Sequence, residues 1–181
     1  MRAQLAVSVL ALAISTAASA TAITFNNATG PYSAGAITAH VTATGGSVYY
    51  QGGLLGPGIG VQSSAFDTLG ALAAGKTLTV SFGQSVTLNS ISFAAWEGGI
   101  DQVTMSYTSG SQTFSNTFNL NAIDTFSTNV VLNSFTLSAA NGLTSTYLNS
   151  IDVTPAVPVP AAAWLFGSGL LGLAGLGRKR K

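Results

Sequence analysis

The chain of 181 residues contains no cysteine and a single histidine, His40. The lack of cysteine excludes a disulfide framework, a thiolate metal site and a cysteine nucleophile. With no second histidine and no His-Glu motif, we expect no transition-metal site. No serine stands in a Gly-x-Ser-x-Gly elbow, so His40 has no recognisable partner for a Ser-His-Asp triad. The sequence therefore predicts no catalytic residue and no metal ligand set, and the protein is expected not to be an enzyme.

Charge is also scarce, at 6% of residues against about 25% in an ordinary soluble domain. Five of the six cations lie at the two ends, in Arg2 and in 178–181. The part of the chain between the ends contains one lysine (Lys76) and five carboxylates: Asp67, Glu97, Asp101, Asp124 and Asp152. Binding of nucleic acid requires several cations that neutralise phosphates. The composition therefore excludes nucleic acid as a partner.

The N-terminal twenty residues have the pattern of an export signal. A single cation, Arg2, precedes an apolar run from Leu5 to Ile14. Ala18-Ser19-Ala20 matches an Ala-x-Ala cleavage site, with Ala20-Thr21-Ala22 as the alternative. These parts and their order are those of a Sec signal peptide, which is too short for a permanent anchor. We expect the following residues to be translocated.

The C-terminal end has three parts of its own. Alternate prolines precede an apolar run from Ala161 to Leu176, and a basic cluster ends the chain. As a helix, that run reaches roughly 24 Å at 1.5 Å per residue, which makes it a short span for a bilayer core of about 30 Å. The cluster predicted to stay on the cytoplasmic side consists of Arg178, Lys179, Arg180 and Lys181.

This order of parts resembles the C-terminal sorting signal of PEP-CTERM proteins, which are exported bacterial proteins processed by exosortases. The motif is closest to the variant called VPLPA-CTERM, with Val159 where that variant has leucine. The residues that carry the likeness are Val157, Pro158, Val159, Pro160 and Ala161. The resemblance implies an exosortase partner, a transient inner-membrane anchor, and release to the cell surface or to an exopolysaccharide matrix or biofilm.

The residue pattern of the body between these ends predicts β-structure. Threonine, serine, valine, isoleucine and aromatic residues form short runs separated by glycine and asparagine. Apolar and polar residues alternate over 37–42, 77–82 and 102–107, which is typical of antiparallel strands with one buried face. We expect an all-β, antiparallel β-sandwich resembling a jelly roll. The one candidate helix lies over 66–74, where Gly70 weakens it.

The triplet Leu-Asn-Ser occurs at 88–90, 132–134 and 148–150, each time followed by an apolar residue. The leucine and that apolar residue are three positions apart, which breaks strict alternation. We predict a bulge or bend at each triplet, with its asparagine or serine bonded to local backbone. Recurrent strand composition is an equally good explanation.

The segment 96–101 combines an aromatic residue, two carboxylates and flexible glycines between two expected strands. Its residues Trp96, Glu97 and Asp101 suggest a sugar-binding or calcium-binding loop, since an aromatic ring stacks on a sugar and carboxylates ligate calcium. Two carboxylates about 5 to 9 Å apart would also serve a glycosidase. The simpler interpretation is a hydrated connection whose tryptophan packs at the edge of the sandwich. The sequence suggests no cofactor other than calcium.

The function expected from sequence is that of an exported, non-enzymatic surface or matrix protein. The alternative is a carbohydrate-binding module, calcium-stabilised in one version, which uses Trp96 and exposed tyrosines such as Tyr49 and Tyr50. A glycoside hydrolase is the third hypothesis. The expected organisation is a signal peptide (1–20), a β-sandwich body (21–154), a proline-rich linker (155–160), a transmembrane helix (161–177) and a basic tail (178–181).

Overall fold

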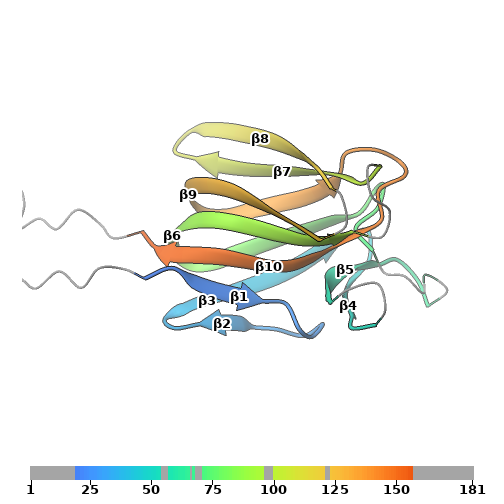
Figure 1. The fold of residues 1–181 in the computed structure, drawn as a ribbon, viewed down its shortest axis with the longest axis horizontal. Coiled ribbons are helices and arrows are strands. Elements are labelled where there is room, and N and C mark those ends of the chain that lie inside the picture. The colour runs from blue at the N-terminus through green and yellow to red at the C-terminus, as the bar shows by residue number, and fades with distance from the viewer. Residues whose placement is uncertain are drawn as a thin grey trace, which may run out of the picture.

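A computed structural model describes residues 19–53, 57–65, 67, 71–95, 100–120 and 123–156. These residues form antiparallel strands, and no helix occurs among them (Figure 1). The strands are β1 (Thr21–Thr24), β2 (Tyr32–Ala34), β3 (Ile37–Thr44), β4 (Ser47–Gln51), β5 (Gly58–Gln62), β6 (Thr77–Ala95), β7 (Gln102–Ser109), β8 (Gln112–Asn119), β9 (Ile123–Ala139) and β10 (Thr146–Pro155). The expected all-β, antiparallel class is confirmed.

Two long strands, β6 and β9, take part in both layers of the sandwich. The first half of β6 pairs with β3 and with the second half of β9, whereas its second half pairs with β10 and with the first half of β9. Between the halves, the β6–β9 register slips from Ser81 to Val86. Strands that bend in this way pass from one sheet of a sandwich to the other.

We call the layer β2-β3-β6-β9-β7-β8 the first sheet and the layer built from β4, β5, β1, β10, β6 and β9 the second sheet. The alternating segments predicted from sequence lie in the first sheet, in β3, β6 and β7. Their apolar residues face inward and form one core with the second sheet. Each large apolar side chain buried in this way contributes about 1.5 to 3 kcal/mol. The fully buried members of these three segments include Ile37, Ala39, Leu78, Val80, Val103 and Met105.

The predicted irregularities at the Leu-Asn-Ser triplets are confirmed. Register shifts enclose Asn89 in β6 and Asn149 in β10, and Asn133 of β9 lies opposite the slip between Ser81 and Val86. The extra residue lets the leucine and the apolar residue three positions later both face inward. The buried pairs are Leu88 and Ile91, Leu132 and Phe135, and Leu148 and Ile151.

The bonding partners of these asparagines differ from the prediction. Asn89 donates to the Thr154 hydroxyl at 2.6 Å, and Asn149 donates to the Pro57 carbonyl at 2.7 Å. Asn133 accepts a hydrogen bond from the Ser85 hydroxyl at 2.6 Å. All these partners belong to other strands or loops and not to local backbone, so the bulges join neighbouring segments of the sandwich.

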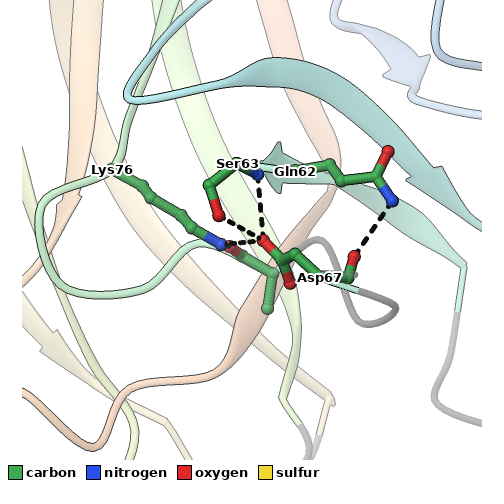
Figure 2. Close-up of polar contacts among 5 residues, drawn as sticks. Gln62, Ser63, Asp67 and Lys76 are labelled. Carbon is green, nitrogen blue, oxygen red and sulfur yellow. Dashed lines mark hydrogen bonds and ion pairs between the residues drawn. The ribbon is translucent and has the colours of Figure 1, made fainter. Parts of the chain in front are cut away.

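The connection from β5 to β6 is fixed by polar contacts around Asp67 (Figure 2). The Asp67 carboxylate accepts hydrogen bonds from the Ser63 N–H at 3.0 Å and the Ser63 hydroxyl at 3.1 Å, and it pairs with the Lys76 ammonium. The Gln62 amide donates to the Asp67 carbonyl at 3.0 Å. Leu72 forms a β-bridge with Thr146, so the described residues of the expected helix 66–74 are not helical.

Both ends of the described body lie at one end of the sandwich (Figure 1). Thr21 pairs with Val153, and the Ala156 N–H donates to the Ser85 carbonyl at 3.0 Å. The predicted signal peptide lies outside the described residues except for Ser19 and Ala20, and the predicted transmembrane helix lies entirely outside them. In the part of the chain that the structure describes, no helical segment has the length and hydrophobicity of a membrane span. Residues 21 and 156 therefore lie at the same end of the body.

Candidate functional site

The predicted ligand loop is described only in part. Trp96 and Glu97 lie outside the described residues, whereas Asp101 is completely buried. The Asp101 carboxylate accepts a hydrogen bond from the Ser145 N–H at 2.6 Å, and its carbonyl accepts one from the Leu120 N–H at 2.9 Å. Asp101 therefore holds together the connections that enter β7, leave β8 and enter β10. This role is structural.

Further bonds close the same end of the sandwich. The Asn141 amide donates to the Ile100 carbonyl at 2.9 Å, and the Thr144 hydroxyl lies 2.8 Å from the Gln102 carbonyl. Among the described residues, no group of three or more His, Asp or Glu side chains could hold a metal ion. The joint site of Trp96, Glu97 and Asp101 stays a prediction.

The other residues singled out from sequence are dispersed. His40 is exposed on the outer face of β3. Tyr49 and Tyr50, expected to be exposed, are half-buried in β4. The sorting motif 157–161 and the basic cluster 178–181 lie outside the described residues. Of these features, the structure describes His40, Tyr49 and Tyr50, and none of the three lies in a common site with Asp101.

A different surface stands out on the first sheet, whose outer face carries rows of hydroxyl groups. Two of these rows cross five neighbouring strands, in the order β3, β6, β9, β7, β8. The first row is Thr44, Thr77, Ser138, Thr104 and Thr117, and the second row is Thr42, Thr79, Thr136, Ser106 and Ser115. Shorter rows at the next position are His40, Ser81 and Ser134, and Thr108 and Thr113. We call this surface the hydroxyl face.

Every member of the hydroxyl face is exposed or half-buried, and no lysine, arginine or carboxylate stands in its rows. Hydrogen bonds between neighbouring strands order its side chains. The hydroxyl pairs are Thr79 with Thr136 at 3.2 Å, Thr104 with Thr117 at 3.1 Å and Thr108 with Thr113 at 3.4 Å. Cross-strand pairs of this kind stabilise a sheet by up to about 1 kcal/mol each.

The hydroxyl face is hollowed where β6 and β9 bend. One depression of about 210 Å³ lies on the face itself and is lined by Ser106, Tyr107, Thr108, Thr113, Ser134, Phe135 and Thr136. An adjoining depression of about 360 Å³ lies at the end of the sandwich and is lined by Ser85, Thr108, Ser109, Gly110, Val131, Leu132, Asn133 and Ser134. Thr108 and Ser134 line both depressions, and we call the two adjoining depressions together the hollow.

The groups in this hollow both donate and accept hydrogen bonds. Threonine and serine hydroxyls offer one donor and two acceptors, and the Asn133 amide offers both kinds of group. Val131 adds an apolar wall, with 52% of its surface exposed. The hollow therefore suits an uncharged ligand that presents many hydroxyls, and it has no group to neutralise an anion or a cation.

Sequence reasoning missed this site, although a signal for it was present. The alternation that predicted the strands places a hydroxyl at every polar position of 77–81, 104–108 and 134–138. Which strands lie side by side, and hence that the hydroxyls form rows, depends on pairings such as Thr79 with Thr136 that are distant in sequence.

No family model matches this chain, and no curated protein matches it. Among solved structures, GH31 CBM32-2 bound to GalNAc aligns with 11% identity and a TM-score of 0.44, over 65% of this chain and 98% of the other. The family 32 CBM from C. perfringens NanJ in complex with galactose aligns with 15% identity and a TM-score of 0.37, over 65% and 92%. CBM32 of AlyQ in complex with 4,5-unsaturated mannuronic acid aligns with 18% identity and a TM-score of 0.37, over 65% and 95%. At this level of similarity, their ligands carry no argument for this chain.

Proposed function

We propose that the β-sandwich is a non-catalytic module that binds neutral polysaccharide on the hydroxyl face, with the hollow at Thr108 and Ser134 as its central subsite. The single observation that supports it is the hollow itself, which is lined by hydroxyl and amide groups and contains no charged side chain. A sugar chain presents hydroxyls of the same kind, and their hydrogen bonds replace those that the face makes with water.

The chemistry of the face favours a neutral chain over an acidic one. An acidic polysaccharide would bring carboxylates or sulfates to a surface without cations, and their desolvation would have no compensating ion pair. A hydrogen bond between uncharged groups contributes about 0.5 to 1.5 kcal/mol net. Binding therefore depends on several sugar units that lie along the rows, and single sugars are expected to bind weakly.

The test measures binding of the full chain, in mild detergent, to neutral and acidic polysaccharides by affinity electrophoresis. Loss of one hydroxyl contact of about 1 kcal/mol weakens binding about fivefold, so Thr108→Val and Ser134→Ala are each expected to weaken it by roughly that factor. Thr24→Val is the matched control, since Thr24 is exposed on β1 in the second sheet, away from the hydroxyl face.

The same measurements distinguish the hollow from the loop 96–101 as the binding site. If Trp96→Ala abolishes binding while Thr108→Val and Ser134→Ala leave it unchanged, the loop 96–101 is the site and the proposal for the hollow fails. If no polysaccharide binds, the module acts as a structural component of the surface or matrix.

We also propose that the body reaches the cell surface through Sec export and exosortase-type processing, on the strength of the two ends of the sequence. The body places both attachment points together, which is compatible with a module held by one tether. Mass spectrometry of the secreted protein is expected to find a chain that begins near Thr21 and ends near residue 160. A secreted chain that retains Arg178 to Lys181 would exclude this processing.

A further inference from the structure

Strand β8 is the last strand of the first sheet and pairs only with β7 within the described part of the chain. It is eight residues long, and all its residues are exposed except Phe118, which is half-buried. A free edge of this kind presents a row of unpaired N–H and C=O groups, to which another strand can add. Figure 1 shows β8 at the margin of the molecule.

Within the described part of the chain, this edge has none of the features that usually prevent strand addition. The hairpin 102–119 contains no charged residue and no proline, and β7 and β8 pair over eight successive positions without a bulge. Natural proteins protect free edges with lysine, proline, bulges or a short strand. An unprotected edge of eight residues is therefore open to pairing with a further strand.

The hairpin geometry shows which backbone groups are free. The connection from Ser109 to Gln112 has two residues and begins with Gly110 at a φ of +64°, as in a type II′ turn. In such a turn the flanking residues form a hydrogen-bonded pair, and hydrogen-bonded and non-bonded pairs then alternate. The outward N–H and C=O groups consequently belong to Thr113, Ser115, Thr117 and Asn119.

The same strand is complementary to a second copy of itself. In a two-fold antiparallel pairing centred on Asn116, Ser115 lies opposite Thr117 of the second copy and Phe114 lies opposite its Phe118. Residues directly opposite each other share a face, so hydroxyl meets hydroxyl on one side and ring meets ring on the other. The pairing also covers Phe114, which is 40% exposed in the single chain and stacks on Tyr107 at 5.3 Å.

We propose that β8 joins two copies of this chain through an antiparallel β8–β8 pairing about a two-fold axis at Asn116. The interface is isologous, because the same strand contributes from both copies. It extends the first sheet across the axis, so that the five-strand hydroxyl rows continue into those of the second copy. A single strand pair is small beside a standard interface, so the dimer is weak in dilute solution and is favoured where copies are concentrated on a surface.

The absence of cysteine from the chain permits a clean test by disulfide trapping. At a non-hydrogen-bonded position on the axis, the two Cα atoms of residue 116 lie about 4.5 Å apart, within the range of a disulfide. We expect the full-length Asn116→Cys chain in mild detergent to form a covalent dimer on mild oxidation, seen on a non-reducing gel. Ser111→Cys is the control, since its two copies lie roughly 30 Å apart in the proposed pairing.

A second pair of variants tests the backbone bonds. Ser115→Pro removes an outward N–H, a position at which an edge strand tolerates proline, whereas Ser115→Ala keeps that N–H. In the Asn116→Cys background, Ser115→Pro is expected to reduce the trapped dimer at least tenfold, and Ser115→Ala is expected to retain it. Far-UV circular dichroism checks that both variants keep the β-fold.

Either of two outcomes overturns the proposal. The first is that Asn116→Cys gives no more covalent dimer than Ser111→Cys. The Ser111→Cys control measures dimer that forms through other parts of the chain. The second is trapping that a folded Ser115→Pro variant leaves unchanged. Neither readout depends on polysaccharide, so this inference stands or falls independently of the proposed function.

Discussion

Substitution of Asp67 by alanine is expected to destabilise the body more than any other single change in its charged residues outside the core. The carboxylate accepts two hydrogen bonds from Ser63 and pairs with Lys76, in the connection between β5 and β6 (Figure 2). Alanine at this position leaves the Ser63 N–H and the Lys76 ammonium to be solvated in a partly closed site.

The magnitude follows from the burial of the pair. The side chains of Lys76 and Asp67 are 13% and 19% exposed, so the pair is intermediate between a surface ion pair and a buried one. A surface ion pair contributes up to about 1 kcal/mol, whereas disruption of a buried pair costs about 3 to 5 kcal/mol. Water replaces part of the lost bonding, so we expect Asp67→Ala to lower the free energy of unfolding by about 2 to 3 kcal/mol. For a chain of this size that corresponds to a fall in Tm of roughly 4 to 12 °C.

The assay is urea unfolding of the full chain in mild detergent, followed by near-UV circular dichroism. Lys76→Met keeps most of the aliphatic stem and removes the charge, and it is expected to cost about 1 kcal/mol because the Ser63 bonds remain. The double variant then gives the coupling between the two charges. A loss below about 0.5 kcal/mol for Asp67→Ala would refute the reasoning, because it would mean that water satisfies these groups as well as the carboxylate does.

Two further predictions concern the core and a turn. Burial, together with the nearby Tyr49 and Asp67, raises the pKa of Tyr147 to about 12, against an ordinary value of 10. As the pH rises, Tyr147 therefore ionises first in the unfolded chain, and the free energy of unfolding should fall by up to about 2 to 3 kcal/mol between pH 10 and 12. Tyr147→Phe should flatten this decline. An unaltered decline in that variant would contradict the raised pKa of Tyr147. A Cβ on Gly46 would lie 2.2 Å from the Gln62 carbonyl oxygen, whereas one on Gly83 meets nothing within 4 Å. Gly46→Ala should therefore cost at least about 2 kcal/mol and Gly83→Ala less than about 1 kcal/mol in the same unfolding assay, and equal effects would show that the Gly46 turn relaxes without cost.

The fold class and the strand interiors were predictable because side-chain direction alternates along any strand. The alternation over 77–82 and 102–107 identified buried faces that the structure confirms. The Leu-Asn-Ser triplets predicted bulges because a leucine and an apolar residue three positions apart reach the same core only if the strand has an extra residue. The asparagine partners were wrong, since a bulge frees the side chain to bond whichever segment lies beside it, such as Pro57 at Asn149.

The loop 96–101 shows the limit of local reasoning about sites. An aspartate beside glycines suggested a ligand, and the structure shows Asp101 buried and bonded to Ser145, which lies 44 residues further along the chain; the joint site with Trp96 and Glu97 stays a prediction. A carboxylate that receives a backbone N–H from a distant loop cannot be recognised from its neighbours in sequence.

The sequence by itself determined the class of structure, the near absence of charge and the two ends that predict export and sorting. Those properties depend on composition and on patterns of short range. Only the tertiary structure decided that β6 and β9 each run through both sheets, that the hydroxyls of five strands form rows, and that β8 lies at the edge of the described sheet. These features follow from pairings between residues far apart in the chain, and a period of two indicates which face a side chain occupies without indicating which strand lies next to it.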